Sequence, residues 1–155
     1  MANTERTLVL VKPDALQRDL LGEIVSRFER KGLKIVAMKF VHLSDAVLDE
    51  HYAHLKSKPF FPGLKQFMMQ TPVVAMVLEG LEAVDAVRKL VGATNPRAAD
   101  AGTIRADLSM NVPSNLVHAS DSVDAAATEV KRFFKADELF DYKKITDLYQ
   151  FGEGV

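Results

Sequence analysis

The chain has 155 residues, enough for one compact domain and short for two, so we expect a single domain over residues 1–155. Hydrophobic residues make up 48% and charged residues 26%, which excludes a disordered or fibrous protein. The formal net charge of -1 gives no global positive field for nucleic acid or anionic membranes, so an anionic ligand must be bound locally.

The chain has no cysteine, which excludes disulfides, zinc–thiolate sites and thiol nucleophiles and suits a reducing cytoplasm. The first residues, MANTERTLVL, reach a charged pair before any apolar stretch typical of a secretory signal. No apolar run approaches the length that spans a bilayer. We therefore expect a cytoplasmic protein that requires neither a membrane nor nucleic acid.

The first predicted elements are a strand and a helix. Residues 7–11, TLVLV, form a continuous apolar run typical of a strand covered on both faces, and Lys12 and Pro13 end it. In the segment 20–32 the apolar side chains recur at helical spacing, and Gly32 ends the predicted helix. The side chains expected to point inward are Leu21, Ile24, Val25 and Phe28.

The middle of the chain continues this alternation. Residues 33–40, LKIVAMKF, predict a second strand, and Ser44 is the expected N-cap of a helix over residues 45–55. Residues 72–78, PVVAMVL, predict a third strand with its proline at the first position, where a missing N–H is tolerated. A further amphipathic helix is predicted over residues 82–91.

Residues 93–114 show little periodicity, and a loop of this length in a small domain is usually functional or disordered. Residues 116–118 predict a short last strand, and either Ser120 or Ser122 begins the helix that follows. This order predicts an α+β fold, a ferredoxin-like sandwich in which a four-stranded antiparallel sheet is covered by helices on one face.

Histidines are the candidates for chemistry, because the common phosphate-binding loops, metalloprotease motifs and serine-hydrolase motifs are absent. His42, His51 and His54 stand beside polar residues and are expected to face solvent. His118 differs, because it ends a predicted strand just before a helix N-terminus, where backbone N–H groups favour an anion. A packed histidine hydrogen-bonded to the backbone is an equal alternative on this pattern alone.

Three cationic residues raise a related question. Lys12 closes a buried strand, so its ammonium either reaches out to solvent, the commoner outcome, or meets an anion. Arg88 lies on the polar face of a predicted helix and Arg105 lies in the long loop, where solvation is the ordinary interpretation. If these residues converged on His118 they would form an anion site, since the guanidinium fork matches phosphate oxygens.

Five separated segments resemble nucleoside diphosphate kinases, in order and over nearly the whole chain. They are ERTLVLVKPDALQRDLLGEI at the start, HYAHLKSKPFFPGL (51–64), GATNP (92–96), GTIRAD (102–107) and NLVHASDSVDAAATEV (115–130). The resemblance implies a phosphotransferase of nucleotide metabolism. In its ping-pong reaction a nucleoside triphosphate gives its terminal phosphoryl group to His118, and the phosphohistidine gives it to a nucleoside diphosphate.

The resemblance also implies roles for the matching residues. Glu129 would orient the His118 ring, Tyr52 would steady Lys12, and Phe60 would stack on the base, which implies broad base specificity. Mg²⁺ would enter as the cofactor on the nucleotide phosphates, with no protein ligand assigned. The positions that match phosphate and sugar contacts are Lys12, Arg88, Thr94, Arg105 and Asn115.

Several alternatives remain open. From the residues alone Phe60 is better explained by core packing, Thr94 by a turn and Asn115 by a strand-end cap. Ala119 stands where the family usually has glycine, and if this position needs a positive φ the alanine costs free energy.

Assembly and activity have alternatives of their own. The resemblance implies a homo-oligomer, and the length beyond Tyr142 favours a hexamer over a tetramer. A catalytically silent nucleotide-binding scaffold and a phosphohydrolase with His118 as its base are the competing hypotheses.

Overall fold

The computed structural model describes residues 3–152 and contains a four-stranded antiparallel sheet in the order β2-β3-β1-β4. The prediction of such a sheet is confirmed. β1 pairs with β3 along its whole length, from Thr4 opposite Leu81 to Val11 opposite Val74. The strands are β1 (Thr4–Val11), β2 (Lys34–Val41), β3 (Val73–Leu81) and β4 (Val117–Ala119).

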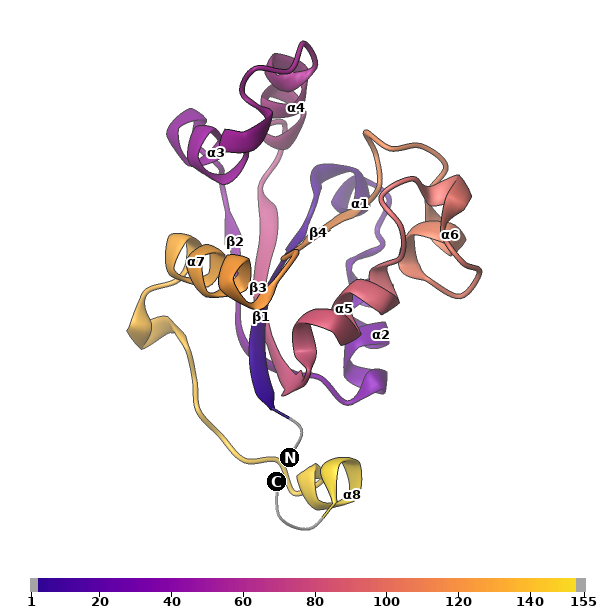
Figure 1. Ribbon diagram of the computed structural model, residues 1–155, viewed down its shortest axis with the longest axis vertical. Helices are drawn as coiled ribbons and strands as arrows, with labels where there is room; N and C mark the ends of the chain where they lie inside the picture. Colours follow the sequence, from indigo (N-terminus) through magenta and orange to yellow (C-terminus); the bar gives the residue numbers. More distant parts are fainter. Residues whose placement is uncertain (1–2, 153–155) are drawn as a thin grey trace.

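Helices cover both faces of the sheet. In Figure 1, α2 (Leu21–Lys31) and α5 (Ala83–Val91) lie to the right of the sheet and α7 (Val123–Phe133) lies to its left. The expectation of helices on one face only is therefore wrong. The cause is the apolar run of β1, whose alternate side chains enter two separate hydrophobic clusters, so that each face of the strand must be covered.

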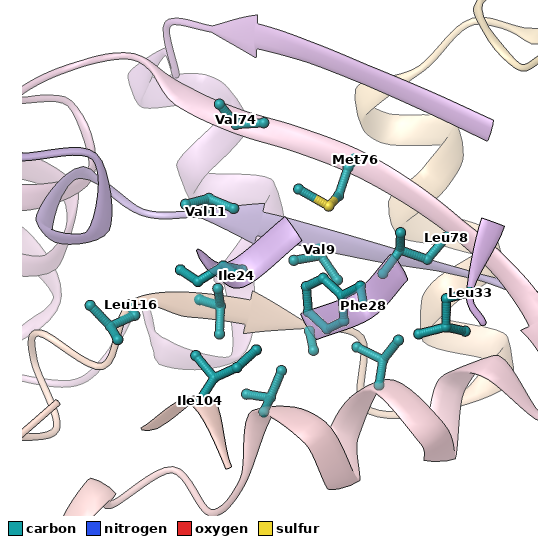
Figure 2. Close-up of a cluster of buried hydrophobic side chains, with 14 of the residues drawn as sticks. Val9, Val11, Ile24, Phe28, Leu33, Val74, Met76, Leu78, Ile104 and Leu116 are labelled. Atoms are coloured by element: carbon teal, nitrogen blue, oxygen red, sulfur yellow. The ribbon is translucent and has the colours of Figure 1, made fainter. Parts of the chain in front are cut away.

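The cluster between the sheet and α2 and α5 is drawn in Figure 2. Phe28 of α2 and Met76 of β3 are completely buried in it, and Leu116, just before β4, points into the same cluster. Full burial of one such side chain contributes about 1.5–3 kcal/mol. The cluster therefore anchors the chain where it enters the last strand.

The capping predictions can be checked directly. Ser44 caps α3 (Asp45–His51), since its hydroxyl accepts a 3.2 Å hydrogen bond from the Val47 N–H. The helix expected over residues 45–55 is shorter than predicted, because a 3₁₀ turn replaces its last part. Ser122 caps α7 through the Ala125 N–H at 3.1 Å, whereas Ser120 is fully buried.

The long loop is partly helical. It contains a 3₁₀ turn at Pro96–Ala98 and the helix α6 (Ile104–Leu108), which Thr103 caps. The loop folds back so closely that a Cβ atom on Gly92 would lie 2.5 Å from the Thr103 hydroxyl oxygen. Gly92 also has a φ of +89°, so a residue without a side chain is needed there.

The remaining helices are short. They are α1 (Pro13–Gln17), α4 (Phe61–Met68) and α8 (Asp147–Phe151), with 3₁₀ turns at Ala53–Leu55 and Ala136–Glu138. None of the helices within residues 3–152 has both the length and the apolar character needed to cross a membrane. In Figure 1 the pair α3–α4 and the segment that holds α6 stand on opposite sides of α1 and β4, near the end of β1.

Candidate active site

His118 is placed by an unusual backbone turn. Leu116 has a φ of 75°, in the left-handed region that costs a leucine about 1–3 kcal/mol. The turn is held at both ends, because the Leu116 N–H donates to Asp14 Oδ2 at 3.0 Å and the Leu116 carbonyl accepts from the Lys12 N–H at 2.9 Å. Burial of the Leu116 side chain offsets the strain, and the chain enters β4 with His118 opposite Leu10.

The imidazole of His118 is oriented by Glu129. Its Nε2 lies 2.8 Å from Oε1 of this carboxylate, so the ring proton is assigned to Nε2. Burial would raise the pKa of the Glu129 carboxyl, but the hydrogen bond and charge of His118 bring this pKa below its ordinary value. Nδ1 of His118 has no hydrogen-bond partner among residues 3–152 and is not a buried atom, so its lone pair faces solvent.

Lys12 is held inside the protein by Asn115. Lys12 is only 6% exposed, which rules out the alternative in which its ammonium reaches out to solvent. Its Nζ donates to Asn115 Oδ1 at 2.7 Å. The Asn115 amide in turn donates to the Thr94 carbonyl at 3.0 Å. Within the described part of the chain the hydrogen-bond partner of Lys12 Nζ is Asn115 and not Tyr52, whose role stays a prediction.

Arg105 lies in α6, where it binds three backbone carbonyls. These belong to Gly92 at 3.0 Å, Asn115 at 3.2 Å and Val117 at 2.7 Å. Burial and the charge of Arg88 lower the pKa of the Arg105 guanidinium to about 10. A cation fastened by neutral carbonyls keeps its full charge for an incoming anion.

The cations of the site are close enough to influence one another. Burial lowers the pKa of the Lys12 ammonium to about 8, which nearby Asp14 opposes and the charge of Arg105 favours. Arg88, half-exposed on α5, donates to Asp121 Oδ1 at 2.6 Å. Lys12 and Arg105, and likewise Arg105 and Arg88, are thus near enough for the charge of one to lower the pKa of the other.

The rings of Tyr52 and His51 lie edge-to-face beside the ring of His118. The ring centroids of Tyr52 and His118 lie 6.3 Å apart, and burial together with the charge of Glu129 raises the pKa of the Tyr52 hydroxyl. His51 was predicted to face solvent, and this prediction is wrong because the residue is only 6% exposed. Its spacing of three residues from the fully buried Leu48 was the signal that sequence reasoning missed.

His42 and His54 are exposed, as predicted.

Phe60 and Thr94 lie at the surface. Phe60, at the start of α4, is 56% exposed, so the core-packing interpretation of this residue is wrong. Thr94 is exposed, and its carbonyl, not its hydroxyl, meets Asn115. The structure gives neither side chain a contact with His118, so their suggested roles depend on a nucleotide that spans the distance.

Three side chains have donor atoms suited to a metal ion. Atoms of His51, His118 and Glu129 lie within 4.8 Å of one another. The guanidinium of Arg132, however, donates to His51 Nδ1 at 2.9 Å, which brings a positive charge against the cluster. Mg²⁺ prefers oxygen ligands, so this nitrogen-rich group does not fit it.

Comparison with known proteins gives a consistent result. A family model described as nucleoside diphosphate kinase matches residues 5–139. A nucleoside diphosphate kinase of Parabacteroides distasonis is 55% identical over 147 residues, which cover 94% of this chain and 96% of the relative. Human nucleoside diphosphate kinase B is 52% identical over 143 residues, which cover 92% and 94%.

Solved structures agree with the sequence matches. A nucleoside diphosphate kinase from Halobacterium salinarum in complex with CDP superposes with a TM-score of 0.93 at 45% identity, over 96% of this chain and 99% of that one. A Borrelia burgdorferi nucleoside-diphosphate kinase with bound vanadate and ADP, described as a transition-state mimic, gives 0.90 at 35% identity over 96% and 98%. With its ferredoxin-like α+β fold and a family match over most of its length, the chain belongs to the nucleoside diphosphate kinase family.

Proposed function

We propose that the protein transfers phosphoryl groups between nucleoside triphosphates and diphosphates through a phosphohistidine on Nδ1 of His118. The observation that carries this proposal is the 2.8 Å hydrogen bond from His118 Nε2 to Glu129, which leaves Nδ1 as the free nucleophile. Its lone pair attacks the γ-phosphorus, the bond to the β–γ bridging oxygen breaks, and the nucleoside diphosphate leaves. A β-phosphate oxygen of a second diphosphate then attacks the same phosphorus, and the N–P bond breaks.

Glu129 is proposed to balance the charge that this step creates. The ring keeps its proton on Nε2, so it becomes positively charged when Nδ1 bonds to phosphorus. The lowered pKa of the Glu129 carboxyl keeps it ionised at neutral pH, next to that proton. Neither half-reaction then requires a proton transfer, which suits an exchange that runs in both directions.

Lys12, Arg105 and Arg88 are proposed to stabilise the transferring phosphoryl group. Phosphoryl transfer depends mainly on positioned positive charge, and two of these cations are already fixed by hydrogen bonds in the protein. Arg88 is bound to Asp121, an exposed pair of the kind that contributes little to stability. A polyphosphate can therefore replace Asp121 as the partner of Arg88 at little cost.

Mg²⁺ is proposed as the cofactor, carried by the nucleotide phosphates rather than by the protein. When bound it would neutralise phosphate charge, while the residues named above orient the reacting atoms. Phe60 offers an exposed aromatic face to the base, and every base has a face to stack on. The CDP and ADP complexes of the two solved relatives, one pyrimidine and one purine nucleotide, support broad base specificity.

The direct test follows the phosphoryl group. The protein is incubated with Mg²⁺ and ATP radiolabelled on its γ-phosphate, and the label on the protein is tested for lability in acid and stability in alkali. Adding GDP should move this label to GTP. His118→Gly should abolish both steps, whereas His42→Gly, which removes an exposed histidine outside the site, should leave them intact.

The other outcomes identify the competing functions. A protein that binds ADP but never acquires label would be a silent nucleotide-binding scaffold. Release of inorganic phosphate without an acceptor diphosphate would make His118 the base of a phosphohydrolase. Unchanged transfer in the His118→Gly variant would falsify the proposal itself.

Self-association is proposed as well. Phe40, on the sheet-edge strand β2, is 66% exposed, and Ile145 and Tyr149 of the C-terminal segment are 94% and 84% exposed. Such apolar side chains are candidates for burial between subunits. Light scattering on the purified protein would measure the subunit number, for which we favour a hexamer over a tetramer.

A cytoplasmic location remains a prediction from the sequence.

A further inference from the structure

Arg132 lies near the end of α7 with its guanidinium largely removed from solvent. Its side chain is 12% exposed, and Nη1 lies 2.9 Å from Nδ1 of His51. A guanidinium has only donors, so Nδ1 of His51 accepts this hydrogen bond. On the other side, Nε of Arg132 lies 3.1 Å from a carboxylate oxygen of Glu50. The guanidinium is therefore held between an exposed carboxylate and a buried imidazole.

This contact decides where His51 carries its proton. Because Nδ1 supplies a lone pair, the single proton of the ring must be on Nε2 and the ring is neutral. Burial lowers the pKa of His51 to about 3, with further lowering by His118 and Arg132 and opposition from Glu129. The side chain is 0% exposed and its buried Nε2 has no hydrogen-bond partner within residues 3–152, so the hydrogen bond from Arg132 to Nδ1 is the contact that selects this tautomer.

The same ring touches the nucleophile. The ring centroids of His51 and His118 lie 4.4 Å apart at an angle of 74°, an edge-to-face contact. Nδ1 of His51 is also 3.7 Å from Oε1 of Glu129, the oxygen that pairs with His118. A proton on Nδ1 of His51 would place a second donor 3.7 Å from this oxygen, so a small rotation of the ring would bring it into competition with the ring of His118.

We propose that Arg132 is a positioning residue for phosphotransfer. By donating to Nδ1 of His51 it keeps that ring neutral with its proton on Nε2, and so reserves Oε1 of Glu129 for His118. The inference rests on the proposed function, since it concerns the orientation of the His118 ring that is proposed to accept the phosphoryl group. Arg132 acts on the chemistry only through His51 and Glu129.

Loss of Arg132 should have a larger effect at lower pH. The groups that face His51 are Glu129 and Arg132 from α7, His118 from β4, His54 from the 3₁₀ turn and the ring of Tyr52. Of these, Arg132 lowers the pKa of His51, so its removal raises that pKa. Protonation of Nδ1 then becomes easier as the pH falls.

The first test determines which ring nitrogen of His51 carries the proton. NMR of the ring nitrogens in full-length, nucleotide-free protein with isotope-labelled histidine distinguishes the two tautomers. The chain has four histidines, and a His51→Asn variant assigns the signals of His51. In the wild type we expect the Nε2-protonated form without titration between about pH 5 and 8. Arg132→Met should populate a proton on Nδ1, and Arg132→Lys, which keeps a donor, should restore the wild-type form.

The second test measures phosphorylation of His118 by ATP in a single turnover. Arg132→Met should slow it roughly 10-fold or more at about pH 6, the size of effect typical of outer hydrogen-bond partners, and less at about pH 8. The KM for ATP should not change. Lys131→Met is the matched control, because it removes a positive charge from the preceding residue of α7, which is exposed.

Two results would overturn the proposal. One is a wild-type His51 that carries its proton on Nδ1. The other is an Arg132→Met variant that keeps both the wild-type spectrum and the phosphorylation rate of Lys131→Met. If Arg132→Met fails to fold, the tautomer of His51 in the wild type and in the Arg132→Lys variant still tests the proposal. A protein with the expected tautomer but no phosphohistidine would contradict only the proposed function.

Discussion

His118 and Glu129 are joined by a 2.8 Å hydrogen bond that links β4 to α7 and determines which ring nitrogen is free. Glu129→Gln keeps the length of the side chain and an oxygen acceptor but removes the charge that faces the phosphorylated ring. We expect phosphorylation of His118 to slow roughly 10- to 100-fold, with the KM for ATP unchanged. Rapid-quench measurement of labelled protein checks this.

Glu29→Gln is the control for this substitution, because it makes the same change at an exposed position of α2. If both variants phosphorylate at the wild-type rate, the charge of Glu129 has no part in the reaction.

Lys12 gives a prediction about pH. Its pKa is about 8 in the free protein, so near pH 8 about half of the molecules carry a neutral amine there. A bound diphosphate favours the ammonium form and therefore raises this pKa. Binding of ADP with Mg²⁺ should take up about half a proton at pH 8 and almost none at about pH 6.5, and affinity should weaken as the pH rises above 8.

Calorimetry of ADP binding in buffers with different ionisation enthalpies measures this uptake. Lys12→Arg is the control, because a guanidinium stays charged over this range. Equal proton uptake by the wild type and Lys12→Arg at the higher pH would assign the proton to another group.

Phe60 and Phe61 are adjacent but have opposite environments, at 56% and 5% exposure. Phe60→Ala should raise the KM for purine and pyrimidine diphosphates alike, roughly 5- to 150-fold, because a stacking contact is worth about 1–3 kcal/mol. Its free energy of unfolding should change by less than about 0.5 kcal/mol. Phe61→Ala should instead lose about 3–5 kcal/mol of stability.

Steady-state kinetics with each nucleotide and urea unfolding measure the two effects. A preference for one base by orders of magnitude, or equal destabilisation by both substitutions, would contradict the stacking role of Phe60.

Ala119 does not have the strain that its sequence suggested. The non-glycine residues with positive φ within residues 3–152 are Asp19, Glu82 and Leu116, so the left-handed turn precedes the nucleophile instead of following it. Ala119 pairs with Val9 in the sheet and is 6% exposed. Ala119→Gly should therefore destabilise the protein by about 0.5–1 kcal/mol without faster phosphotransfer, as urea unfolding and kcat would show. A gain in stability would mean that the alanine is strained after all.

Much of the fold could be predicted from local patterns. The apolar run of β1, the spacing in α2 and the caps at Gly32 and Ser44 each depend on neighbours in sequence, so the pattern alone was sufficient. The order of the strands and the second layer of helices depend on pairing between distant segments. The pattern showed that β1 is buried on both faces, but not which helices cover it.

The site divides in the same way. Resemblance identified His118 and Glu129, and the structure shows the hydrogen bond between them. The resemblance did not identify Arg132 or the buried state of His51, because both depend on packing between α3 and α7. Asp14, which holds the Leu116 turn, lies 102 residues away in sequence, beyond the reach of any local pattern.

Arg105 has a further consequence for how the enzyme can change. Its guanidinium ties the end of α5, at Gly92, to both sides of the turn at Leu116, so it is a cross-link as well as a charge. A lysine could supply the charge, but one ammonium cannot satisfy three separated carbonyls in a plane. Mechanical support of the turn before His118 and the positive charge proposed to attract phosphate therefore reside in a single side chain, so a lysine at this position would keep the charge but lose the cross-link.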